Sequence, residues 1–74
     1  MMILELRRYA ARQQAVEIIY LKKDGEASRR TIRVVHIDGN KGSLKAYCYR
    51  RKAYRVFVLD NILAIAPVSG HFAG

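Results

Sequence analysis

The chain has 74 residues, of which 51% are hydrophobic and 27% charged, so it has room for one small globular domain and is too hydrophobic to be disordered. Fourteen lysines and arginines against six acidic residues give a net charge of +8, which favours phosphate-bearing or other anionic partners. A single cysteine excludes an internal disulfide, no apolar run approaches the ~18 residues of a membrane helix, and the N-terminus lacks a signal-peptide pattern, so we expect a cytoplasmic protein.

A short basic helix is predicted over residues 3–14. Ile3, Leu6 and Ala10 are spaced three and four residues apart and form one apolar stripe with arginines at its margins. We expect this helix to cover one open end of a small barrel.

Strand patterns recur from residue 15 to residue 67. We predict strands at 16–21, 31–37, 43–50, 54–59 and 62–66, separated by turns that include Asp24-Gly25 and the Gly- and Asn-rich segment 38–42. The adjacent Val34 and Val35 indicate either a bulge or a strand buried on both faces. This spacing predicts a mainly β fold, a bent five-stranded antiparallel sheet or open barrel, with a frayed, flexible tail at 68–74.

The segment from Ala46 to Ile62 carries the strongest functional pattern. Two alternating runs flank a basic turn, and we expect Arg50 and Arg55 to lie beside the aromatic residues Tyr47 and Phe57 on neighbouring strands. Arginines among aromatic rings suit an anion or a stacked base.

Structural readings compete with this one. Arg55 could simply pair with Asp60 or Glu17 at a strand edge. The tyrosines could serve as amphipathic residues at the rim of a barrel.

Catalytic and metal-binding patterns are missing from the sequence. Cys48 falls on the apolar side of its strand with Leu44 and Ala46, which predicts a buried small side chain, and His36 and His71 are isolated. We therefore predict no enzyme activity, no cofactor and no metal site.

The same segment resembles the C-terminal half of the WYL domain, a small bacterial regulatory module. The matching residues are Ala46-Tyr47-Cys48, Arg50, Arg55, Phe57, Leu59-Asp60 and Ile62. Upstream, 16–20 and 29–32 resemble the first two strands of the family, so the resemblance covers residues 15–67. The Trp-Tyr-Leu motif of the family would fall at 42–44, where only its leucine, Leu44, is present.

The resemblance implies a single WYL-like domain over residues 1–74, an SH3-like or Sm-like barrel with a short N-terminal helix. It implies a non-enzymatic module that binds single-stranded nucleic acid, or a negatively charged small ligand, and modulates transcription, with a regulatory protein partner or a homo-oligomer left open. With 74 residues, we expect this chain not to include the helix-turn-helix domain that usually precedes WYL domains. We expect the ligand on one basic and aromatic face; the predicted site residues are Tyr20, Arg30, Tyr47, Arg50, Arg55 and Phe57.

Two other functions are compatible with the pattern. One is a structural or interaction protein that oligomerises through its strand edges, without a nucleic-acid ligand. The other is an Sm-like RNA chaperone that forms a ring.

Overall fold

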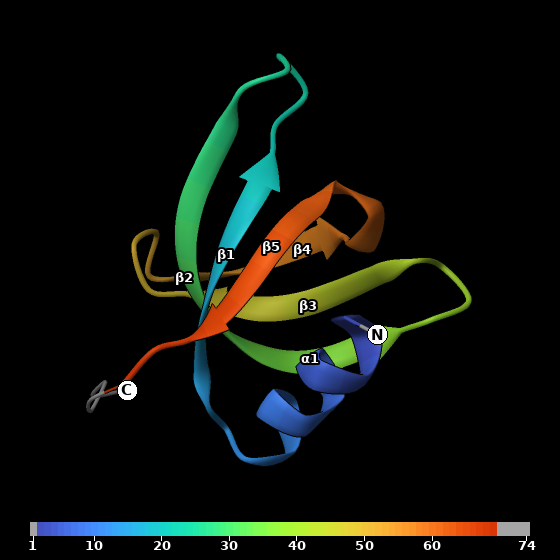
Figure 1. Cartoon of the computed structure of the whole chain (residues 1–74), viewed down its shortest axis with the longest axis vertical. Coiled ribbons are helices and arrows are strands. Elements are labelled where there is room, and N and C mark those ends of the chain that lie inside the picture. The colour runs from blue at the N-terminus through green and yellow to red at the C-terminus, as the bar shows by residue number, and fades with distance from the viewer. Residues whose placement is uncertain (1, 70–74) are drawn as a thin grey trace.

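A computed structural model describes residues 2–69 of the chain (Figure 1). The elements in chain order are α1 (Met2–Ala11), β1 (Ala15–Leu21), β2 (Ala27–Asp38), β3 (Ser43–Cys48), β4 (Ala53–Val58), the 3-10 turn η1 (Leu59–Asn61) and β5 (Ile62–Pro67). Figure 1 shows α1 beside β2, at the opposite end of the molecule from the β1–β2 turn.

The five strands form one antiparallel sheet in the order β4-β3-β2-β1-β5. The predicted five antiparallel strands and the N-terminal helix are therefore confirmed. The sheet is bent but not closed, because β4 and β5 are edge strands and do not pair with each other in the part of the chain that is described, so the open form of the predicted barrel is the one that the structure has. A side chain bridges the opening instead: the backbone N–H of Val58 in β4 donates to the hydroxyl of Tyr20 in β1, at 3.0 Å.

The core lies on the inner face of the bent sheet, which we define as the side that carries Ile18, Ile32, Ala46 and Cys48. All four side chains are fully buried. Successive residues of a strand point to opposite sides, so the alternate residues form an outer face. The helix contributes Leu6, which is also fully buried, and this agrees with its predicted apolar stripe.

The helix ends three residues earlier than predicted. Gln13 adopts a left-handed backbone conformation with φ of 53°. Its N–H donates to the carbonyl of Ala10 at 3.1 Å, and the N–H of Gln14 donates to the carbonyl of Tyr9 at 2.9 Å. This pair of bonds is the Schellman arrangement, which satisfies the last carbonyl groups of a helix and turns the chain away from its axis.

The second strand is longer than predicted, and this matters for the site. It begins at Ala27, four residues before the predicted start, so both Arg29 and Arg30 lie in a regular strand. The register of β2 against β3 shifts between Val34 and His36, which confirms the bulge and leaves Val35 50% exposed.

The third strand is shorter than predicted and ends at Cys48, so the segment 49–52 forms the turn that leads into β4. After β5, Val68 is tied back to the fold, because its N–H donates to the carbonyl of Ala15 at 3.0 Å and its carbonyl accepts from Nε2 of Gln14 at 2.8 Å. The rest of the predicted flexible tail, from residue 70, and His71 lie outside the described residues. Within residues 2–69, the helix is too short and too polar to cross a membrane.

Candidate ligand-binding pocket

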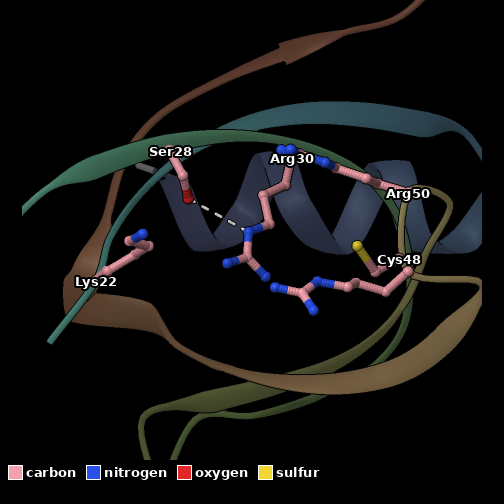
Figure 2. A pocket seen from close by; sticks show the side chains of 6 residues that line it. Lys22, Ser28, Arg30, Cys48 and Arg50 are labelled. Carbon is pink, nitrogen blue, oxygen red and sulfur yellow. Dashed lines mark hydrogen bonds between the residues drawn. The ribbon is translucent and has the colours of Figure 1, made fainter.

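A cavity of about 380 Å³ opens where the end of β1, the start of β2 and the β3–β4 turn meet (Figure 2). Four of its six lining residues are basic and none is acidic; the lining consists of Lys22, Ser28, Arg30, Cys48, Arg50 and Arg51. The only acidic partner in contact with this set, within the described residues, is Asp24, whose carboxylate lies 3.8 Å from Nζ of Lys22. That pair is largely exposed to solvent and offsets little of the positive charge.

Arg30 is the basic side chain that the fold positions most firmly. It lies on the inner face, two residues before the buried Ile32. Its Nε donates to Oγ of Ser28 at 3.3 Å, the bond drawn as a dashed line in Figure 2. The guanidinium carbon lies 5.8 Å from the centroid of the Phe57 ring, within the range of a cation–π interaction. These two contacts hold the fork of the guanidinium at the pocket.

Two predicted site residues lie behind Arg30 and do not line the pocket. Phe57 is only 2% exposed, so its ring has almost no surface to offer a ligand. Tyr20 packs edge-on against it, with ring centroids 5.0 Å apart and planes at 83°. The structure thus makes Phe57 and Tyr20 a support for Arg30, and a direct contact of Phe57 with a ligand does not fit this geometry.

The other two predicted residues do not line the pocket, and only Tyr47 leaves the face predicted for Arg30, Tyr47, Arg50 and Arg55, because Arg55 is the cross-strand partner of Ala46 and lies on the inner side. Tyr47 lies on the outer face, because it alternates with the buried Ala46 and Cys48. Arg55 is exposed and is not part of the pocket lining. Its predicted alternative partner, Glu17, lies 3.7 Å from Nε of Arg29 instead.

Sequence reasoning missed four lining residues, which are Lys22, Ser28, Cys48 and Arg51. Ser28 precedes Arg30 by two positions and therefore shares its face, a signal that a longer predicted second strand would have revealed. Lys22 and Arg51 lie at or beside turns, where the direction of side chains follows no regular period that a sequence could reveal.

Cys48 lines the pocket and is fully buried, which confirms the prediction of a buried side chain on the apolar side of its strand. Within residues 2–69, the structure has no group of three or more His, Cys, Asp or Glu side chains that could hold a metal ion. What the pocket can do chemically is attract and orient an anion.

Comparisons with known proteins agree with the resemblance. The model of the WYL domain family matches residues 2–67 of this chain. Among solved structures, the chain is similar to proteasome accessory factor B/C (PafBC) of Arthrobacter aurescens, with a TM-score of 0.84 and 16% sequence identity. The similarity covers 99% of this chain but only 12% of the PafBC chain. No curated protein matches the sequence.

Proposed function

The chain belongs to the WYL domain family, and on this premise we propose that it is a non-enzymatic regulatory module whose basic pocket binds a phosphate-bearing ligand. The ligand is a single-stranded nucleic acid, or a small molecule that carries the same anionic group. Binding modulates transcription through a regulatory protein partner.

The observation that carries the proposal is the convergence of three arginines and one lysine on one pocket whose lining has no carboxylate. Like charges held close together raise the free energy of the empty site, and an anion removes that penalty. Arginine also presents a planar fork that matches two phosphate oxygens, which a lysine cannot do.

The support behind Arg30 strengthens the proposal. Because Ser28 and the buried Phe57 already hold the guanidinium, a ligand loses little side-chain entropy when it binds there. The same support suggests a route for a signal, because Phe57 contacts Tyr20 and Tyr20 holds the edge of β4.

Binding of fluorescent single-stranded and duplex oligonucleotides across a salt series tests the proposal. We expect Arg30→Ala to weaken binding of single strands about tenfold or more and to reduce the slope of log affinity against log salt by about 0.7. Arg30→Lys keeps the charge without the fork and should recover only part of the affinity.

Arg29→Ala is the matched control, because Arg29 is the sequence neighbour of Arg30 but lies on the opposite face, with its side chain 73% exposed. It should change the affinity far less than Arg30→Ala. Equal effects of the two substitutions would show that only net charge matters, and no binding of any phosphate-bearing probe would remove the proposed function.

An apolar sheet edge favours a second candidate function, self-association through β4. The outer side of this strand carries Tyr54, Val56 and Val58, which are 55%, 69% and 45% exposed, without any charge among them. Such an edge is a template for pairing with another strand. Sedimentation of the wild type and of Val56→Lys tests it: self-association that resists salt and is abolished by the lysine supports this function, and a monomer at all concentrations contradicts it.

A further inference from the structure

Three tyrosines form a connected cluster away from the pocket, on the outer side of the β3–β4 hairpin. The ring of Tyr47 contacts that of Tyr49 with centroids 5.3 Å apart and planes at 83°. It contacts the ring of Tyr54 at the same distance with planes at 72°. We call these three residues the tyrosine cluster; none of them lines the pocket.

The cluster is only partly used for packing. Edge-to-face contacts fix the orientation of the rings relative to one another, but Tyr54 remains 55% exposed on an edge strand. A ring that served the core alone would be buried, as Phe57 is at 2%. The fold therefore presents an oriented aromatic surface to solvent.

Positive charge borders the same surface. Nζ of Lys45 lies 5.6 Å from the centroid of the Tyr54 ring. Arg33 is the cross-strand neighbour of Tyr47, and its shielded Nε has no hydrogen-bond partner within the described residues. Aromatic faces beside cations are the combination that binds the bases and the backbone of single-stranded nucleic acid.

The cluster is continuous with the pocket through the chain itself. Tyr49 belongs to the cluster, and the next two residues, Arg50 and Arg51, line the pocket. Consecutive Cα atoms are only about 3.8 Å apart, so the two surfaces meet at the β3–β4 turn. A single-stranded nucleic acid with one phosphate in the pocket can therefore pass around this turn onto the outer face of the sheet.

We propose that the tyrosine cluster is a base-stacking site, and that the pocket and the cluster together bind successive nucleotides of one single strand. This inference rests on the proposed function of the pocket and selects a single-stranded nucleic acid over a small anion as the ligand. It also explains why the basic and aromatic residues lie on two faces: each face binds a different part of the same nucleotide chain.

The test compares Tyr54→Leu with Tyr54→Phe, because the side chain is more than half exposed and both variants should fold. The probes are labelled thymidine oligonucleotides of one to eight nucleotides and an abasic strand of the same length. We expect the affinity of the wild type to rise with oligonucleotide length. Tyr54→Leu should weaken binding of the longer oligonucleotides about five- to 150-fold, the usual value of one stacked base. Tyr54→Phe should bind like the wild type, and the abasic strand should not distinguish the three proteins.

The outcomes separate this inference from the proposed function. Suppose that oligonucleotides bind, and that Arg30→Ala weakens this binding whereas Tyr54→Leu does not. The stacking site is then wrong, and the proposed function of the pocket stands. Affinity that does not change with length leads to the same conclusion. If neither the thymidine oligonucleotides nor the abasic strand binds, the stacking site is wrong, and the proposed function fails as well if inorganic phosphate does not bind either.

Discussion

Replacing Tyr20 with phenylalanine tests whether one hydroxyl holds the open sheet together. The substitution keeps the ring, and with it the edge-on contact to Phe57 at 5.0 Å. It removes only the acceptor of the bond from the N–H of Val58, which at 3.0 Å links β1 to the edge strand β4. Any change therefore reports on that bond and not on the packing of the core.

The expected loss follows from the environment of the bond. An intramolecular hydrogen bond contributes about 0.5–1.5 kcal/mol net. Val58 is 45% exposed, so water can replace part of the lost bond and the cost should fall near the lower end, about 0.5–1 kcal/mol. In a domain of this size 1 kcal/mol corresponds to roughly 4–8 °C in Tm, so a decrease of about 2–8 °C is expected.

Urea unfolding gives the change in stability, and amide hydrogen exchange locates it. The Val58 amide should exchange about two- to fivefold faster in Tyr20→Phe than in the wild type, and the amides of neighbouring residues should change less. Tyr9→Phe is the control, because it removes the same atom from a partly buried tyrosine of α1. If the Val58 amide is equally protected in Tyr20→Phe and in the wild type, the hydroxyl does not hold the β4 edge and the reasoning is refuted.

Two further predictions concern the helix. Gln13→Gly should stabilise the protein by about 0.5–1 kcal/mol in urea unfolding, because φ at this position is 53° and glycine adopts it without strain. The control is Arg12→Gly, which should destabilise the protein because φ of Arg12 is not positive. Equal effects of the two substitutions would argue against the left-handed end of the helix. Leu6→Ala should cost about 2–5 kcal/mol, because the side chain is fully buried in the core, whereas Leu4→Ala, at a residue 55% exposed, should change stability by less than about 0.5 kcal/mol. Similar small losses for both leucines would mean that α1 does not dock on the sheet.

Strand alternation is the part of this protein that could be predicted from local sequence. Leu44, Ala46 and Cys48 were expected on one face of their strand and are all buried, with Tyr47 on the other face. This succeeds because the side-chain period of a strand depends only on backbone geometry. It also shows why Tyr47 could not belong to the predicted face, since Tyr47 cannot share a side with Arg30 once both strands are regular.

The ends of the elements were harder to predict. The helix stops where Gln13 turns left-handed, at a residue type that carries no strong end signal. The second strand gains residues from Ala27 because β1 is there to pair with them, a contact that the local sequence does not contain.

The membership of the pocket was decided by the tertiary structure alone. Phe57 belongs to β4 and Tyr20 to β1, which are not neighbours in the sheet order, yet their rings touch because the sheet bends until its two ends approach. Arg30 then lies against Phe57, and the arginines of the β3–β4 turn meet the lysine that follows β1. The sequence by itself determined which side chains point inward and how much positive charge the chain carries; which of those charges share one cavity depends on the curvature of the whole sheet, a property that no single strand encodes.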